Sequence, residues 1–216
     1  MSGRNLIKSR STGAQTDCAQ PGFVEARPGS AAAMCATVRV LPLRTEHLDA
    51  VLDIERQVSP AGWTRKIFLT ELAYPDSRCY LVAQTETPSG LQVVAFAGMQ
   101  LQTDEAHITT IAVDPAHRRR RLASRLLVEL LHEARDRGAC AATLEVRIHN
   151  TAAQRLYAGF GFRPVGVRPR YYEGRVDALI MWAHDIDGRE YGHRLRTLAE
   201  RLAPAWDTWD RFGERA

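Results

Sequence analysis

The stretch from Glu105 to Leu131, EAHITTIAVDPAHRRRRLASRLLVELL, decides the fold. Its first part is rich in β-branched residues as far as Val113, which predicts a strand, and Pro115 ends that strand because proline lacks an amide hydrogen. Its last part predicts an amphipathic helix, because leucines recur there at helical spacing: Leu122, Leu126, Leu127, Leu130 and Leu131. A helix that opens directly from a strand end leaves backbone N–H groups unpaired, and anions bind there. The run Arg118 to Arg121 adds guanidinium groups that suit phosphate, so the stretch predicts a phosphate site.

The residues before this stretch predict two helices between strands. Thr37 to Leu41 alternates as a first strand, and an apolar stripe after Thr45 predicts a helix. Thr64 is placed to cap a second helix. Two further strands, at 79–84 and 93–101, are separated by turn residues and are expected to form a hairpin.

The residues after the stretch predict a short helix between strands. Gly138 is expected to end the long helix, and 142–146 forms a strand. Asn150 is placed to begin a short helix, and two strands follow at 165–171 and 177–182. The order βααβββαβαββ indicates an α/β fold with a mixed sheet that is covered on both faces.

Composition limits the chain to one main domain and excludes several classes of protein. With 216 residues and 45% hydrophobic content, the chain can bury one good core. The net charge of +4 fits a phosphate-bearing cofactor, and it also fits work near nucleic acid. The four cysteines have no Cys-x-x-Cys spacing, so we expect neither a metal site nor a disulfide framework. No apolar run approaches the roughly 20 residues of a membrane span, and we expect a cytoplasmic protein.

Both ends of the chain are expected to be extensions of that domain. Residues 1–36 are rich in Ser, Gly, Ala and Pro and predict a disordered segment. Residues 186–216 predict a helical extension, with Leu195, Leu198 and Leu202 at helical spacing. This extension either covers its own domain or provides a surface for a dimer or a partner.

Three motifs resemble the GNAT superfamily of N-acetyltransferases. The acetyl-CoA motif of that family is Arg or Gln, two residues, Gly, one residue, then Gly or Ala; Arg118 and Ala123 match it, while Arg121 replaces the central glycine. The segments LEVR at 144–147 and LYAGFGF at 156–162 are similar to those of the RimI-type branch, the ribosomal-protein-alanine N-acetyltransferases. The resemblance covers about residues 37–185. It implies a mostly antiparallel central sheet flanked by helices, and acetyl-CoA as the cofactor.

The resemblance also implies which residues hold that cofactor. The expected contacts, largely through the main chain of the strand and of the turn that follows it, are Ile111, Ala112, Val113, Arg118, Arg119, Arg120, Arg121, Leu122, Ala123, Ser124 and Asn150. Asn150 could instead serve only as the helix cap. If Arg121 has helical dihedral angles, its side chain can turn outward and the site survives, which is the outcome that we favour; otherwise affinity falls.

The family roles of general base and general acid fall on Glu145 and Tyr157. Acyl transfer needs a neutral amine, and Glu145 on the neighbouring strand is placed to remove its proton. The alternative is a strand carboxylate paired with Arg147 or Arg118. Tyr157 is placed to protonate the departing thiolate, and its alternative role is that of a core aromatic.

The implied acceptor is the α-amine of a protein N-terminus, with the alanine of a small-subunit ribosomal protein as the candidate. Trp63, Tyr171 and Tyr172 are the expected residues of the peptide site, although they could belong to the core. A lysine side chain or a small-molecule amine is the alternative acceptor. The alternative to an enzyme is a non-catalytic module that binds acetyl-CoA or RNA phosphates, although we expect no direct nucleic-acid binding.

Overall fold

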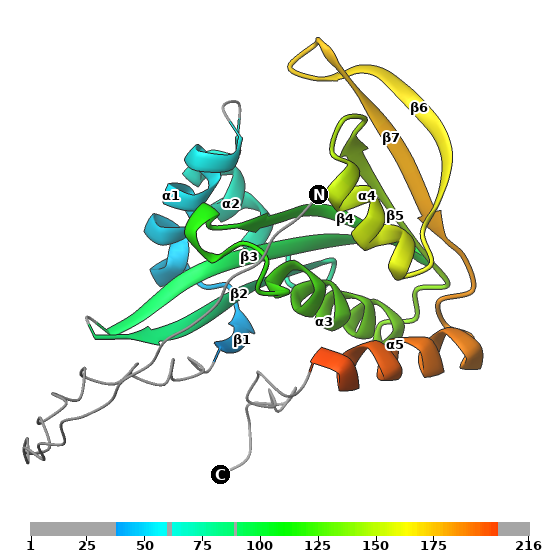
Figure 1. The fold of residues 1–216 in the computed structure, drawn as a ribbon, viewed down its shortest axis with the longest axis horizontal. Coiled ribbons are helices and arrows are strands. Elements are labelled where there is room, and N and C mark those ends of the chain that lie inside the picture. The colour runs from blue at the N-terminus through cyan, green and yellow to red at the C-terminus, as the bar shows by residue number, and fades with distance from the viewer. Residues whose placement is uncertain (1–37, 60–61, 89, 203–216) are drawn as a thin grey trace, which may run out of the picture. The chain divides into compact units, whose positions relative to one another are not determined.

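A seven-stranded sheet forms the centre of the computed structural model, which describes residues 38–59, 62–88 and 90–202. The strand order is β1-β2-β3-β4-β5-β7-β6, and only β4 and β5 are parallel (Figure 1). The elements in chain order are β1 Val38–Pro42, α1 Leu48–Val58, α2 Arg65–Leu72, β2 Arg78–Thr87, β3 Gly90–Gln102, β4 Glu105–Val113, α3 Leu122–Asp136, β5 Ala141–Arg147, α4 Thr151–Gly159, β6 Arg163–Tyr172, β7 Val176–Ala183 and α5 Arg189–Leu202. The predicted α/β class, the mixed sheet and the order of elements are confirmed.

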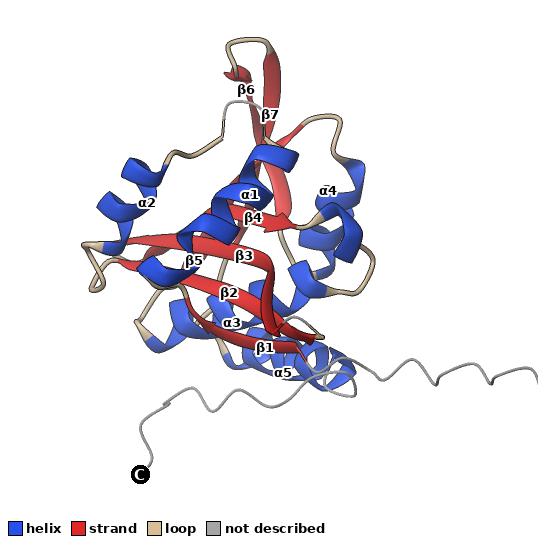
Figure 2. Ribbon diagram, turned by 90° about the vertical axis from the view of Figure 1, so that its left-hand side faces the viewer, coloured by secondary structure: helices blue, strands red, loops and turns tan. Residues whose placement is uncertain are grey.

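Helices cover both faces of the sheet, as Figure 2 shows, with α1 and α2 on one side and α3 and α5 on the other. The leucines of α3 are buried against inward-facing residues such as Leu144 and Val146. The other core centres on Phe68 and Phe96, whose rings meet edge to face with 5.6 Å between their centroids. None of the helices within the described ranges combines the length and apolar composition that a membrane span requires.

Local signals in the sequence define where several helices begin and end. The Thr64 hydroxyl accepts a hydrogen bond from the Ile67 amide, and the Asn150 side chain accepts one from the Ala153 amide. Gly138 follows α3 with a φ of 85°, a left-handed conformation that glycine adopts without steric cost. The predicted helix boundaries at these three residues are confirmed.

The predicted lengths of two strands need correction, and both ends of the chain lie outside the described residues. Strands β2 and β3 run on to Thr87 and from Gly90, well beyond the predicted 79–84 and 93–101, because polar residues there still pair across the hairpin. The helix α5 packs its buried Leu195 and Leu202 into the same core as α3. The proposed N-terminal extension 1–36 and the end of the chain from 203 onward lie outside the described residues.

Replacement of Gly98 by alanine is expected to destabilise the fold by about 1–3 kcal/mol, the usual cost of overpacking. A Cβ at Gly98 would lie 2.0 Å from the Tyr80 ring. That ring cannot move easily, because the Tyr80 hydroxyl donates to Glu71 at 2.9 Å and lies 3.2 Å from the Thr109 hydroxyl. Urea or thermal unfolding measures the effect.

Gly159→Ala is the matched control, because a Cβ at Gly159 meets no other atom within 4 Å. Its stability should equal or slightly exceed that of the original chain, since alanine is the better helix former. Equal stability of the Gly98→Ala variant and the original chain would mean that the Tyr80 ring yields to the added methyl group.

Candidate active site

The sheet splits between β4 and β5, and this split defines the site. The two strands pair only from Glu105 to Ile108 on β4 and from Ala141 to Leu144 on β5. Strand β4 then has one extra residue, Thr109, because Gly98 pairs with Thr110 whereas Met99 pairs with Ile108. This bulge and the loss of pairing leave the following main chain of β4 with an edge that β5 does not occupy.

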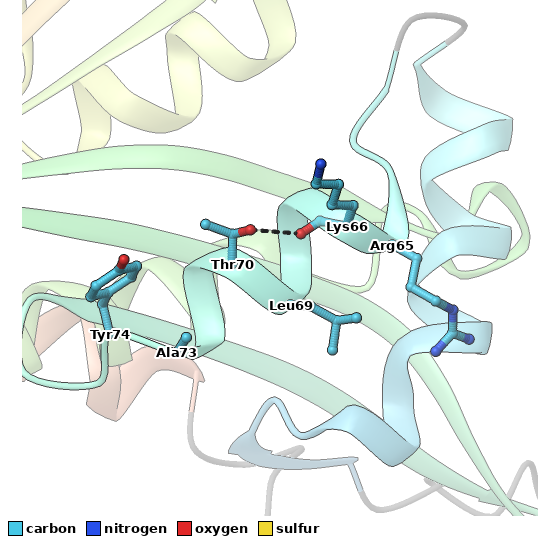
Figure 3. A pocket seen from close by; sticks show the side chains of 6 residues that line it. All are labelled: Arg65, Lys66, Leu69, Thr70, Ala73 and Tyr74. Atoms are coloured by element: carbon cyan, nitrogen blue, oxygen red, sulfur yellow. Dashed lines mark hydrogen bonds between the residues drawn. The ribbon is translucent and has the colours of Figure 1, made fainter.

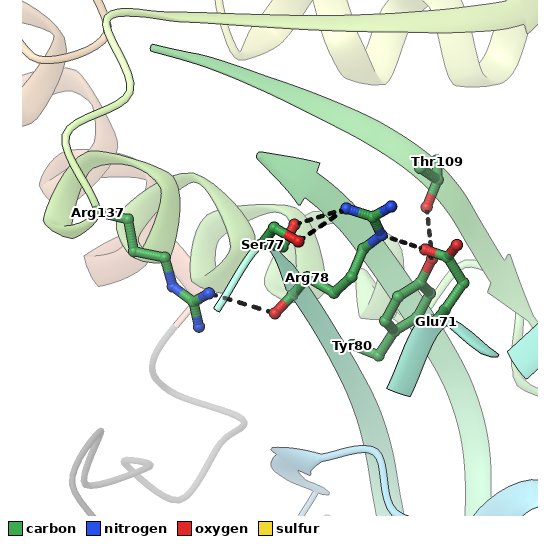
Figure 4. A network of polar contacts seen from close by, with 6 residues as sticks. All are labelled: Glu71, Ser77, Arg78, Tyr80, Thr109 and Arg137. Atoms are coloured by element: carbon green, nitrogen blue, oxygen red, sulfur yellow. Dashed lines mark hydrogen bonds and ion pairs between the residues drawn. The ribbon is translucent and has the colours of Figure 1, made fainter. Parts of the chain in front are cut away.

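Polar contacts on the α2 side hold the bulged residue in place. The Tyr80 hydroxyl bridges Thr109 and Glu71, and Glu71 also pairs with Arg78 at 2.6 Å (Figure 4). The peptide groups of Ile111 and Val113 follow directly on the unpaired edge. An amide-bearing pantetheine arm fits such an edge as an added strand would. The Ala112 side chain is buried, so Ala112 can contribute only its main chain.

The arginine-rich turn leads from this edge into α3. Arg118 to Arg121 are exposed, and α3 begins at Leu122. The first intrahelical bond joins the Arg125 amide to the Arg121 carbonyl, so the amides of Leu122, Ala123 and Ser124 precede it and remain available to an anion. The Leu122 side chain is buried in the core, which leaves its amide as the group that can bind. These residues fit the diphosphate of acetyl-CoA.

Arg121 does not have the helical dihedral angles that would leave its side chain free to turn outward without strain. Its φ is 60° and its ψ is 18°, in the left-handed region that favours glycine. The side chain is nevertheless exposed and donates at 3.4 Å to the Arg201 carbonyl, near the end of α5. The backbone at this position therefore has a conformation that glycine adopts without steric cost, while the guanidinium contacts α5.

Arg121→Gly is expected to stabilise the fold by about 0.5–1 kcal/mol. Relief of the left-handed conformation gives about 1–2 kcal/mol, and the greater flexibility of unfolded glycine offsets part of it. Acetyl-CoA affinity should change less than about fivefold, because an exposed charge contributes about 0–1 kcal/mol. Thermal unfolding and calorimetric titration with acetyl-CoA measure the two effects.

Arg121→Ala separates the backbone from the charge, because it removes the guanidinium but keeps a Cβ. It should be less stable than Arg121→Gly. Equal stability of the two variants would contradict the assignment of backbone strain at this position.

Glu145 lies on β5 at the point where the strands separate. One carboxylate oxygen lies 2.7 Å from His107 Nε2, and the other lies 3.0 Å from Arg168 Nη1. Its side chain is only 10% exposed. The hydrogen bond from His107 lowers the pKa of the Glu145 carboxyl, and Arg168 adds to this effect against the opposing effect of burial. Glu145 is thus held as a carboxylate.

The partners of Glu145 differ from the ones expected for a purely structural carboxylate. Arg147 instead makes a two-pronged ion pair with Glu173, at 2.8 and 2.6 Å, and its guanidinium lies 4.2 Å from the centre of the Tyr172 ring. The structure gives no contact between Glu145 and Arg118 among the described residues. His107 and Arg168 were not identified as site residues from the sequence. The one signal that could have suggested His107 is its position on the cofactor strand itself.

Tyr157 lies on α4 and packs against the core on the α3 side. Its ring centre is 6.0 Å from that of Phe162. Burial raises the pKa of the Tyr157 phenol above its ordinary value, and the Tyr172 phenol raises it further. The hydroxyl therefore keeps its proton at neutral pH, which a general acid requires.

The three expected peptide-site aromatics divide into two groups. Trp63 packs on Phe68 and Tyr80, with ring centres at 5.3 and 6.0 Å, and borders the α1–α2 core. Tyr171 and Tyr172 lie at the end of β6, in a hairpin that projects beyond the rest of the sheet (Figure 1).

Tyr172 contacts β5, whereas Tyr171 is exposed to solvent. The Tyr172 hydroxyl donates a hydrogen bond to the main-chain carbonyl of Glu145 at 2.9 Å. Burial raises the pKa of Tyr172 to about 12. Tyr171 is 43% exposed. The hairpin thus places Tyr172 directly against β5 at Glu145.

Asn150 has the helix-cap role, since its Oδ1 accepts from the Ala153 amide at 3.1 Å. Its side chain is exposed, so the amide nitrogen remains able to reach a cofactor.

Two hollows in the surface lie away from Glu145 and Tyr157. The larger one, of about 670 Å³, runs along α2 between Arg65 and Tyr74 (Figure 3). Neither it nor the smaller hollow of about 230 Å³ beside Arg137 is lined by Glu145 or Tyr157.

Known proteins resemble this chain in sequence and in fold. The model of the acetyltransferase (GNAT) family matches residues 48–162. A putative ribosomal protein bS18-alanine N-acetyltransferase of Bacillus subtilis is 34% identical over 141 residues, which are 65% of this chain and 91% of that protein. The Escherichia coli ribosomal protein bS18-alanine N-acetyltransferase is 38% identical over 142 residues, which are 64% of this chain and 92% of that protein.

The crystal structure of the Escherichia coli ribosomal-protein-S18-alanine N-acetyltransferase superposes with a TM-score of 0.60. Its identity to this chain is 34%, and the match covers 69% of this chain and 94% of that structure. Together with the split sheet and the arginine-rich turn, these matches show that the chain belongs to the GNAT family, in its RimI-type branch, and is an acetyl-CoA-dependent N-acetyltransferase.

Proposed function

We propose that the chain acetylates the α-amine of a protein N-terminus in the cytoplasm, with the N-terminal alanine of a small-subunit ribosomal protein as the candidate acceptor. The main support is its 34% and 38% identity to proteins named for that acceptor, over 91% and 92% of their lengths. The position of Tyr172 against Glu145 agrees with an acceptor that enters beside the β6–β7 hairpin.

The chemistry requires two proton transfers. A peptide α-amine has a pKa of about 7.7–8.0 and is partly protonated at neutral pH, so a proton must leave before the amine can attack. Glu145 serves this removal, directly or through another group. When bound, acetyl-CoA supplies the thioester. Tyr157 donates the proton that the departing thiolate takes up.

Glu145 and Tyr157 lie on opposite sides of the sheet. Glu145 points away from its buried neighbours Leu144 and Val146, which pack under α3, and so faces the α1–α2 side. Tyr157 packs with the α3 core. An acceptor on one face and a cofactor on the other would meet at the split, with one proton-transfer group on each side.

The charges near Glu145 favour a single amine over a polyamine. Arg168 lies 3.0 Å from the Glu145 carboxylate and balances its charge, while Arg147 and Glu173 balance each other. Because the charges of these four residues cancel, they provide no net negative charge to attract a ligand with several positive charges. A neutral or singly charged peptide N-terminus does not depend on such an attraction.

A panel of peptides tests the proposal. Peptides that differ only in their first residue, including alanine, serine, glycine and methionine, are incubated with acetyl-CoA and analysed by mass spectrometry. The matched control is the alanine peptide with a blocked N-terminus and an internal lysine. Modification of the free α-amine of the alanine peptide is expected. Modification only of lysine or of free spermidine would refute the proposed acceptor.

A further inference from the structure

His107 and Glu145 form a pair that the two catalytic roles above do not explain. His107 on β4 pairs in register with Thr143 on β5, and Glu145 lies two residues further along β5. Residues two apart on a strand point to the same face, so both side chains face the α1–α2 side. The contact between His107 Nε2 and Glu145 Oε2, at 2.7 Å, lies beside the last paired residues before the strands separate.

The contacts of Glu145 decide the tautomer of His107. A carboxylate can only accept hydrogen bonds, so the short contact requires the hydrogen on His107 Nε2. In the neutral ring, Nδ1 then carries the free lone pair. Among the residues that the structure describes, none makes a hydrogen bond with Nδ1, and 31% of the His107 side chain is exposed.

The Glu145 carboxylate alone is too weak a base to remove the proton of an α-ammonium group efficiently. Both of its oxygens have partners, and the hydrogen bond from His107 lowers its pKa below the ordinary carboxyl value. A general base that takes a proton from an α-ammonium group works best when its pKa lies near the operating pH. An imidazole group, with an ordinary pKa of about 6.5, is closer to that range than an ordinary glutamate carboxyl group, with a pKa of about 4.3.

We propose that His107 is the group that takes the proton from the acceptor ammonium, and that Glu145 holds the imidazole in position. The ammonium N–H bond breaks and an Nδ1–H bond forms, which leaves the amine with its lone pair. The charge of the resulting imidazolium is balanced by Glu145 through the Nε2 hydrogen bond, and the proton later passes to solvent. This proposal rests on the acyl transfer to an amine set out above, and it assigns the base side of that reaction.

The surroundings of His107 contain few other charges. On β3 it pairs with the neutral Gln100, and beyond that strand Arg78 is neutralised by Glu71 of α2. On β5 it meets Glu145, whose other oxygen is held by Arg168 from β6. Its own strand carries Glu105 two residues away. Glu145 is the charged group in direct contact with the imidazole, so it determines the tautomer and the orientation of the ring.

His107→Gln is the principal test, because glutamine can still donate a hydrogen bond to Glu145 but has no basic nitrogen. The variant should lose about 10²–10⁴-fold in kcat, the usual range for general-base catalysis, with acetyl-CoA affinity unchanged by calorimetry. The residual activity should also lose the pH-dependent limb that a general base contributes to the rate. His193→Gln, a substitution of an exposed histidine on α5, is the matched control and should behave like the original chain.

A second variant and a spectroscopic measurement separate catalysis from folding. His107→Ala should regain part of its activity when imidazole is added to the buffer. In ¹⁵N NMR of the protein without substrate, at a pH where imidazole is neutral, the His107 ring should carry its hydrogen on Nε2. Glu145→Gln should give a mixture of tautomers, because an amide can donate as well as accept.

The outcomes distinguish this proposal from the proposed acceptor. A kcat of His107→Gln within about threefold of the original would overturn the role of His107 and leave Glu145 as the base itself. A hydrogen on Nδ1 in the NMR experiment would overturn it as well. If no peptide is acetylated but a small amine is, the proposed acceptor is wrong. The role of His107 is then tested by measuring the same variants with that amine.

Discussion

Glu145→Gln is expected to lower kcat by about 10²–10⁴-fold while acetyl-CoA still binds with its original affinity. The amide keeps the size of the side chain but removes the negative charge that His107 and Arg168 contact at 2.7 and 3.0 Å. The proton-accepting group then loses either its charge or its orientation. Steady-state assays of released thiol give kcat, and calorimetric titration gives the dissociation constant for acetyl-CoA.

A matched carboxylate and a double variant sharpen this prediction. Glu86→Gln removes an exposed carboxylate on β2 whose partner Arg39 lies 3.8 Å away, and it should leave kcat unchanged. Groups that act as one unit have strongly non-additive effects, so His107→Gln combined with Glu145→Gln should be little slower than the slower single variant. Additive losses would mean that the two residues serve separate steps. Normal turnover of Glu145→Gln would remove the carboxylate from the mechanism.

The order of elements could be predicted because it depends on local patterns. Leucine spacing defined α3, and the side chains of Thr64 and Asn150 each cap a helix within three residues of their own position. Such signals act between neighbouring residues in the chain, so they can be recognised without knowledge of the fold. The motif around Glu145 and Tyr157 was equally local, and it led to the family.

The partners of Glu145 could not be predicted because they depend on register between strands. His107 is 38 residues away in the sequence, and one residue of slip between β4 and β5 would turn its side chain to the other face. The pair of Arg147 with Glu173 likewise depends on distant residues, because Glu173 lies in the turn of the β6–β7 hairpin, 26 residues away. Arg121 shows a further limit, since a left-handed φ at an arginine runs against residue preference and follows from the turn that the whole loop must make.

Tyr157→Phe is expected to lower kcat by about 10²-fold, the lower end of the range for acid–base catalysis. A thiol has an ordinary pKa of about 8.5, so a thiolate already leaves readily and gains less from a proton donor than an amine gains from a base. Phenylalanine keeps the packing against Phe162, so stability should hardly change. Steady-state kinetics and thermal unfolding of the same preparation measure both quantities.

Tyr191→Phe is the reciprocal control, because it removes a hydroxyl that has a structural partner. The Tyr191 hydroxyl on α5 donates to the Phe160 carbonyl at 2.8 Å, and this bond ties α5 to the end of α4. Its loss should cost about 0.5–1.5 kcal/mol of unfolding free energy with kcat unchanged. Activity lost only at Tyr157 and stability lost only at Tyr191 would separate a phenol that transfers a proton from one that holds the fold. A Tyr157→Phe variant with full kcat would instead return Tyr157 to the role of a core aromatic.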